Sequence, residues 1–71
     1  MNYKVTVVLA DGSHVPGYAR TEYSIGNYGT VLVTISGKPF RASEIVAKGM
    51  RIICIEGEVR EVLKDAGFPV A

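Results

Sequence analysis

Cysteine and histidine are almost missing from this chain of 71 residues, which contains one of each. The single cysteine, Cys54, excludes a disulfide within the chain. Its place in the apolar run RIICIEG predicts a small buried side chain. The single histidine, His14, lies far from Cys54 in the sequence, so the pair matches neither a zinc motif nor a nucleophile and its base. We therefore expect no metal site.

Long apolar runs and a strong net charge are also missing. No run approaches the roughly 20 apolar residues that a membrane span needs. The start of the chain, MNYKVTVVLADG, alternates and breaks at Asp11-Gly12, unlike a secretory signal. These features predict a cytoplasmic protein with no membrane partner. The net charge of +1 argues against an extensive phosphate-binding surface, but it leaves room for a local basic patch.

Catalytic motifs are missing as well. The segment GNYG lacks the following helix that a phosphate-binding loop requires. Asp, Ser and His stand together in ADGSH, but residues this close on one turn cannot form a triad, and turn chemistry explains them. The acidic residues between 56 and 65 are typical of a solvated helix face. We expect neither an enzyme nor a cofactor.

Alternating β-branched residues predict a chain rich in strands. The clearest cases are YKVTVVLA and TVLVTI, in which one set of apolar residues shares a face. Pro16 marks an edge, a strand start or a bulge, because proline cannot donate to a ladder, and Gly17 suggests a bulge or a bend. The predicted strands are 3–10, 14–23, 30–35, 39–42 and 50–56, the last buried on both faces.

Two helical segments are expected. The first is a short turn over 43–48, with Ser43 as its N-cap and Gly49 just beyond its end. The second is an amphipathic helix over 57–66, in which apolar residues recur at helical spacing. Its expected buried residues are Val59, Val62, Leu63 and Ala66.

These elements predict one domain over residues 1–71, mainly β and α+β by content. Short strands joined by glycine-rich turns favour a small, strongly bent five-stranded sheet or partly open barrel. The helical turn precedes the last strand, and the C-terminal helix covers an open end or face. The alternative is an α+β sheet with this helix laid flat on one face.

Aromatic, basic and amide side chains cluster around the second and third strands, near the loop SIGNYG. Tyr18, Arg20 and Glu22 alternate onto one face of the second strand, and Tyr23 falls on the other. Tyrosine and arginine can stack on bases, and lysine can meet phosphates; alternatively, the tyrosines only cover sheet edges. The candidate ligand-binding residues are Tyr18, Arg20, Asn27, Tyr28, Lys38 and Arg41.

Part of the chain, about residues 5–46, resembles the Sm-like family of small RNA-binding barrels. VVLADGSHVPG has the apolar strand, the Asp-Gly and the later glycine of the first Sm motif, and Asn27 follows at the family's spacing. FRASEI resembles the second motif, with Ala42 in place of its glycine, and Tyr23 and Lys48 replace the family's Asp and Ile. The family's helix precedes its barrel, whereas the helix here follows. The resemblance implies an SH3/Sm-type barrel, and for a true relative it implies a ring with Asn27 and Arg41 in an RNA-base pocket.

Two functions are compatible with this sequence. The first is a non-catalytic protein-interaction module, such as an adaptor or an inhibitor of the type that phages and mobile elements encode, docking through a strand edge at 16–23 or through its helix. The low net charge favours it. The second is a small barrel that binds RNA, single-stranded DNA or a nucleotide-like ligand through the six candidate residues. With 48% hydrophobic residues in so small a domain, we also expect a homo-oligomer.

Overall fold

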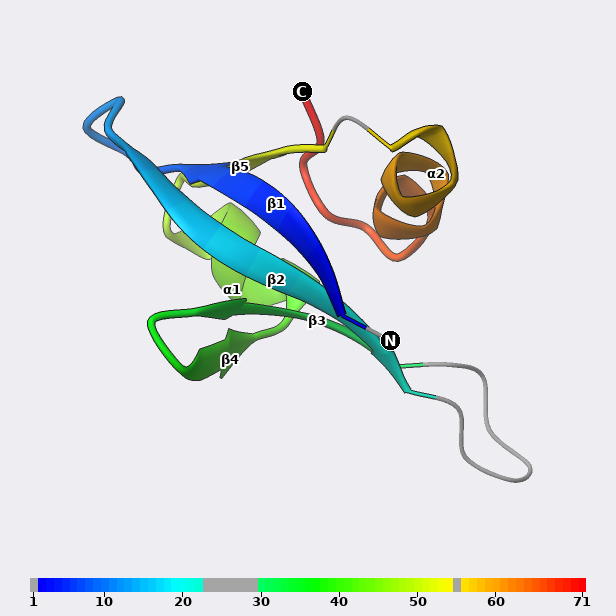
Figure 1. Cartoon of the computed structure of the whole chain (residues 1–71). Helices are drawn as coiled ribbons and strands as arrows, with labels where there is room; N and C mark the ends of the chain where they lie inside the picture. The colour runs from blue at the N-terminus through cyan, green and yellow to red at the C-terminus, as the bar shows by residue number, and fades with distance from the viewer. Residues whose placement is uncertain (1, 23–29, 55) are drawn as a thin grey trace.

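A computed structural model describes residues 2–22, 30–54 and 56–71. These residues form one five-stranded antiparallel sheet with the strand order β4-β3-β2-β1-β5, and two short helices (Figure 1). The mainly β composition and the order of elements predicted from the sequence are confirmed. The described strands form an open sheet with β4 and β5 at its two ends, so the closure of a barrel is not seen.

The elements lie close to their predicted positions, with shorter fourth and fifth strands. The strands are β1 (Asn2–Val8), β2 (His14–Glu22), β3 (Thr30–Ile35), β4 (Lys38–Phe40) and β5 (Arg51–Ile53). The helices are α1 (Ala42–Ala47) and α2 (Gly57–Asp65). The fourth strand ends at Phe40 because α1 begins two residues later.

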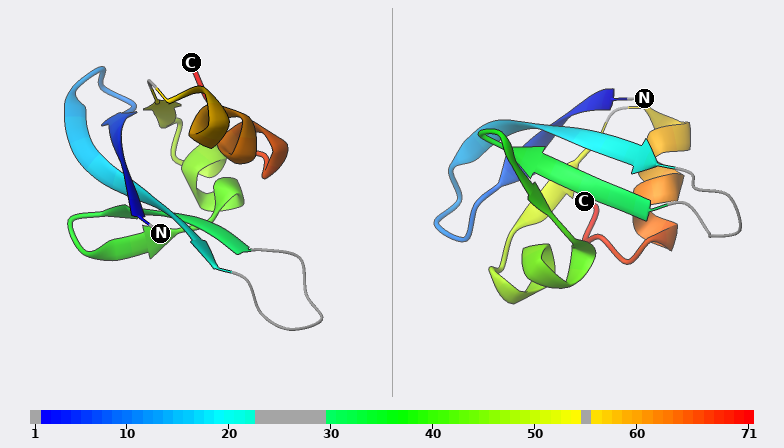
Figure 2. Two further views of the ribbon diagram at one scale, coloured as in Figure 1. Left: turned by 45° about the vertical axis from the view of Figure 1, so that its right-hand side comes forward. Right: turned by 90° about the horizontal axis from the view of Figure 1, so that it is seen from below.

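The sheet has one covered face and one open face. Val5, Val7 and Val33 are buried on the covered face, where the helices contribute Ile45 and Leu63 to the same core. Figure 2 shows both helices on this side of the bent sheet. Because side chains alternate along a strand, the residues between these positions belong to the open face.

β2 is the central strand, and this corrects the expected edge at 16–23. It pairs with β1 from His14 to Arg20 and with β3 from Tyr18 to Glu22. Pro16 lies outside the β2–β3 pairing, which agrees with its missing N–H. The β1–β2 register runs without interruption past Gly17, so the suggested bulge is wrong. Glycine is needed there because the strand lies close to its neighbours: a Cβ would come within 3.0 Å of Val7 Cγ2.

The two helices end with the same motif. In α1, the N–H of Met50 donates to the Ile45 carbonyl while Gly49 has a φ of 68°. In α2, the N–H of Phe68 donates to the Leu63 carbonyl while Gly67 has a φ of 93°. These are Schellman caps, in which a left-handed residue reverses the chain. Each cap carries a further apolar residue, Met50 or Phe68, into the core.

Three helix predictions need correction. Ser43 is not the N-cap of α1: the helix begins at Ala42, and the N–H of Arg41 donates to Glu44 Oε1 at 3.1 Å. In α2, Val59 and Leu63 are buried as expected, but Val62 is 40% exposed and Ala66 is exposed. The sheet thus covers a narrower stripe of α2 than the apolar spacing suggested.

β5 lies at one end of the five-stranded sheet, but its outer side also has a backbone partner. It pairs with β1, and Ile52 forms an isolated parallel bridge with Val70 on its other side. The Ile52 N–H donates to the Pro69 carbonyl, and the Ala71 N–H donates to the Ile52 carbonyl, each at 2.8 Å. Met50 and Cys54, which flank the strand, are buried as predicted. The predicted strand over 50–56 is therefore reduced to Arg51–Ile53.

Among the described residues, no helix has the length and apolar character needed to cross a membrane.

Candidate functional site

Tyr18 lies on the central strand and points to the open face of the sheet. Its side chain is 49% exposed, among the most exposed large apolar side chains of the described residues. The register places Lys4 of β1 on one side of it and Thr34 of β3 on the other. Directly opposed residues of antiparallel strands have Cβ atoms about 5 Å apart. The tyrosine ring therefore has a lysine as its immediate lateral neighbour.

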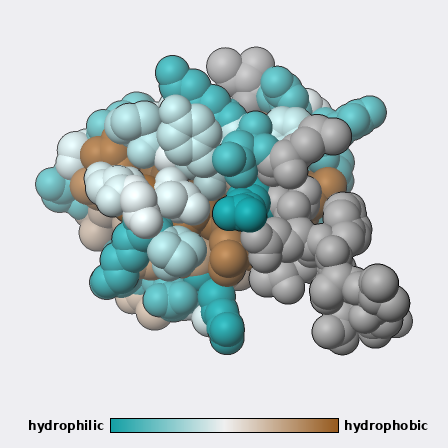
Figure 3. Space-filling view, turned by 60° about the horizontal axis from the view of Figure 1, so that its bottom comes forward, coloured by the Kyte–Doolittle hydropathy of each residue, from teal (hydrophilic) through white to brown (hydrophobic). Residues whose placement is uncertain are grey.

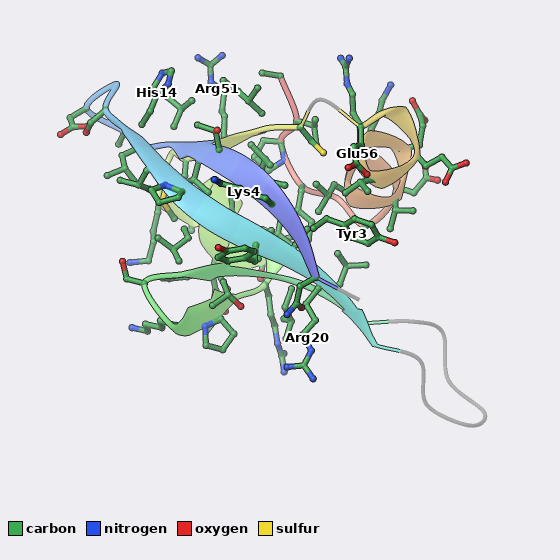
Figure 4. All side chains as sticks on the ribbon, in the orientation of Figure 1. Tyr3, Lys4, His14, Arg20, Arg51 and Glu56 are labelled. Atoms are coloured by element: carbon green, nitrogen blue, oxygen red, sulfur yellow. The ribbon has the colours of Figure 1, made fainter. Side chains whose placement is uncertain are left out.

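The open face is also basic. Lys4, Arg20 and Arg51 are exposed and belong to it by strand alternation, as does His14. Figure 4 labels these four residues, which come from three neighbouring strands. The side chain of Glu22, predicted on this face, lies outside the described part of the chain. Four of the seven carboxylates (Glu56, Glu58, Glu61 and Asp65) fall instead at the start of α2 or within it.

Apolar side chains fill the spaces between these charges. Val8, Leu32 and Ile53 are half-buried on the open face. Viewed from the side of β2, β3 and β4, the surface consists mainly of hydrophilic and intermediate residues with smaller apolar areas between them (Figure 3). This mixture suits a ligand that presents both charge and flat apolar surface.

A cleft of about 430 Å³ opens between β1, β5 and the start of α2. It is lined by Lys4, Val5, Thr6, Ile53 and Glu56. Lys4 and Glu56 come from different elements (Figure 4), and both are exposed. Within the described residues, neither the Lys4 ammonium nor the Glu56 carboxylate has a hydrogen bond or an ion pair. The cleft thus offers one cation and one anion above an apolar floor.

The four predicted site residues that the structure describes do not share one surface. Tyr18 and Arg20 share the open face. Lys38 pairs with Ile35 and so belongs to the covered side of the sheet, at its edge. Arg41 is exposed just before α1. Asn27 and Tyr28 lie outside the described residues, and so does the predicted meeting of their loop with Arg41.

Lys38, predicted as a ligand-binding residue, lies beside an aromatic ring of the core. Its Nζ lies 5.6 Å from the centre of the Phe40 ring, and Lys48 Nζ of α1 lies 5.9 Å from the same ring. Both distances are within the range of cation–π attraction. A lysine of β4 and a lysine of α1 therefore both lie next to the ring of a core phenylalanine.

Sequence reasoning missed Lys4 and Glu56. Alternation in YKVTVVLA places Lys4 opposite the core side chains, but its position beside Tyr18 depends on the pairing register. Glu56 was assigned to the solvated face of the following helix, whereas it precedes that helix as its N-cap residue and lines the cleft. The exposure of Arg51 could have been predicted from the sequence, since it is the one charged residue between Met50 and Ile55.

Other chemistry-bearing residues have local roles. Asp11 accepts hydrogen bonds from the hydroxyl and the N–H of Ser13. These bonds hold the pKa of the Asp11 carboxyl below its usual value, because they favour the ionised form. The bond from the Ser13 hydroxyl has the largest effect. Cys54 is buried, with its Sγ 3.7 Å from the Glu56 carbonyl oxygen. Residues 2–22, 30–54 and 56–71 contain no group of three or more His, Cys, Asp or Glu side chains arranged to hold a metal ion.

The chain was compared with protein families, curated proteins and solved structures, and no match was found in any of the three.

Proposed function

We propose that this protein is a non-catalytic binding module that holds single-stranded nucleic acid on the open face of its sheet. The observation that carries the proposal is the exposed Tyr18 ring on the central strand, directly beside Lys4 and in line with Arg20. Unpaired bases stack on exposed aromatic rings, and nearby cations attract the phosphates that follow each base. An open sheet face can hold several such contacts at once.

The distribution of charge supports this choice over the protein-interaction function that the low net charge favoured. The net charge of +1 averages a sheet face that carries Lys4, Arg20 and Arg51 with an α2 segment in which four carboxylates outnumber Arg60 and Lys64. A polyanion is attracted by the charge of the surface that it contacts and not by the net charge of the protein. A nearly neutral chain can therefore still bind nucleic acid with a defined orientation. The expected affinity is modest because few cations are available for phosphate contacts.

The test is fluorescence anisotropy with labelled single-stranded RNA and DNA at about 50 and 200 mM salt. We expect binding that weakens as salt rises. Tyr18→Ala removes one stacking platform and should weaken binding about tenfold, since base–aromatic stacking contributes about 1–3 kcal/mol. Lys4→Gln should reduce the steepness of the salt dependence by about 0.7, the value for one phosphate contact on a single strand.

Lys64→Gln is the matched control for Lys4→Gln. Lys64 is an exposed lysine in the last turn of α2, away from the open face of the sheet, so its loss should leave the salt dependence unchanged. Equal effects of the two substitutions would indicate attraction to overall charge and would contradict a site on the sheet. Absence of binding to every strand at low salt would remove the proposal.

A partner protein is the second candidate, and the exposed valines of the two helices favour it. Val46 of α1 is 57% exposed and Val62 of α2 is 40% exposed. Such side chains are often covered by a partner or by another copy of the same chain. Light scattering of the purified protein, alone and with the Val62→Lys variant, tests self-association. A monomer at high concentration would contradict the homo-oligomer that we propose.

We retain an SH3/Sm-like small barrel as a proposed relationship for this fold. The continuous β1–β4 meander, the helical segment before β5 and the bent sheet support it. An experimental structure in which the ends of the sheet lie apart, with no pairing between them, would argue for an independent α+β architecture.

A further inference from the structure

We infer that the cleft between β1, β5 and α2 is a subsite for a guanine base of the bound strand. This inference rests on the proposed function, and it adds a sequence preference to a surface that would otherwise bind any strand. The cleft is lined by Lys4, Thr6, Ile53 and Glu56, together with Val5.

The position of the cleft connects it to the stacking residue. Lys4 lines the cleft and is also the register partner of Tyr18. A base stacked on Tyr18 would therefore have the cleft next to it, across β1. Successive bases of a strand that crosses the sheet from β2 toward β5 could occupy the ring and then the cleft, with Lys4 between them.

The two charged side chains match the edges of guanine. Guanine presents two adjacent donors, N1–H and the N2 amino group, and on its other side the acceptors O6 and N7. A carboxylate only accepts hydrogen bonds and can accept two in parallel, so Glu56 suits the donors. An ammonium only donates, so Lys4 suits O6, N7 or a phosphate. Neither charge has a partner among the described residues that it would have to leave.

The other bases fit this pair of charges less well. Adenine and cytosine each place a ring-nitrogen acceptor beside the amino donor, and that acceptor would face the carboxylate lone pairs. Uracil offers one N–H between two carbonyl oxygens. Each therefore makes one favourable contact with Glu56 at most, and a lost bidentate contact typically reduces affinity severalfold to about a hundredfold.

The cleft is also suited in size and lining to a flat heterocycle. Its volume of about 430 Å³ lies within the range of small-molecule sites. Ile53 is half-buried and provides apolar contact for the face of a ring, while Thr6 adds a hydroxyl and the buried Val5 closes the floor of the cleft. A free guanine nucleotide has the same chemistry as a guanine within a strand, so the experiment must separate these two sources.

The experiment measures binding of labelled oligonucleotides that differ at one central base. The set is r(UUUUGUUUU) and its counterparts with adenine, cytosine, uracil or inosine at the centre. We expect the guanine strand to bind about tenfold more tightly than the adenine strand. Inosine keeps N1–H but lacks the N2 amino group, so its affinity should fall between the two. Unlabelled guanosine monophosphate is added as a competitor.

Glu56→Gln is the decisive variant, because the amide keeps the size of the side chain but replaces one acceptor oxygen with a donor. It should remove the preference for guanine, which is measured within each protein as the ratio of the affinities for the guanine strand and the all-uracil strand. Glu58→Gln is the matched control, since Glu58 is exposed nearby on α2 but does not line the cleft. The amide resonances of Thr6 and Ile53 should shift with the guanine strand in the wild-type protein and not in Glu56→Gln.

The outcomes separate this inference from the proposed function. Equal affinity for all five strands would overturn the guanine subsite and leave strand binding intact. Binding of no strand would remove both. A third outcome is that guanosine monophosphate shifts the Thr6 and Ile53 resonances while none of the oligonucleotides does. The ligand of the cleft would then be a free nucleotide and not a strand, which would overturn the inference as stated.

Discussion

Gly17 of β2 and Val7 of β1 lie so close that a Cβ on the glycine would be 3.0 Å from Val7 Cγ2. The same Cβ would be 3.1 Å from the Thr34 carbonyl oxygen on the other side. Val7 is fully buried and cannot move without disturbing the core. The approach of these strands therefore depends on the absence of a side chain, even though Gly17 has no left-handed backbone angle.

Substitution Gly17→Ala should consequently destabilise the fold. We expect a loss of about 1–3 kcal/mol in the free energy of unfolding, as for other overpacked core positions. Urea denaturation measures it. Gly57→Ala is the control, because a Cβ there meets nothing within 4 Å and alanine favours the helix that begins at this residue. A Gly17→Ala protein as stable as wild type would show that β1 and β2 can separate without cost.

Leu63 and Val62 of α2 should respond differently to truncation. Leu63 is fully buried, so Leu63→Ala should cost about 2–5 kcal/mol of unfolding free energy. Val62 is 40% exposed, and Val62→Ala should be nearly neutral because it loses less burial and gains helix propensity. Thermal unfolding of both variants checks the orientation of the helix. Comparable losses would mean that a partner copy covers Val62.

The Asp11–Ser13 pair predicts a specific effect of pH. Because the folded pKa of Asp11 is lowered, its bonds to Ser13 stabilise the protein above the unfolded pKa near 3.9, and this contribution disappears as the pH falls through the folded pKa. Ser13→Ala should raise the Asp11 pKa toward its usual value in an NMR titration. Ser43→Ala, which alters an exposed serine elsewhere, should not. An unchanged pKa in Ser13→Ala would contradict the hydroxyl as its main cause.

The bridge between the C-terminal segment and β5 gives a further prediction. Ala71→Pro removes the N–H that donates to the Ile52 carbonyl at 2.8 Å. We expect a loss of about 1 kcal/mol, and faster hydrogen exchange at the Ile52 amide, whose own bond to Pro69 lies next to it. Ala71→Gly retains the N–H and is the control for a change of side chain at this position. If both variants exchange alike, the bridge does not protect β5.

The sequence indicated the elements well because their signals are local. β-Branched alternation marked β1 and β3, and Gly49 marked the end of α1, where the structure has a left-handed residue. The breadth of the buried stripe on α2 is not local: Val62 and Leu63 both fit the helical spacing, and only the sheet determines which of them is covered.

The candidate site was less predictable because it depends on register. Lys38 was grouped with Tyr18, but the two-residue turn Ser36–Gly37 pairs Lys38 with Ile35, which places both on the covered side. Lys4 is next to Tyr18 only because Asn2 pairs with Arg20 and the ladder continues in step. Prediction of the cleft would require the tertiary arrangement as well as the register, since the cleft lies between β1, β5 and the residue before α2.

The isolated bridge from Ile52 to Val70 also limits how this molecule can assemble. At one end of the sheet, β5 has its outer backbone groups engaged by the C-terminal segment. At the other end, β4 has only three residues, and its central Pro39 has no N–H to offer. Neither end is suited to β-augmentation or to fibril growth by strand addition. At β4 and β5, neighbouring molecules are therefore expected to meet the protein through side chains and not through backbone pairing.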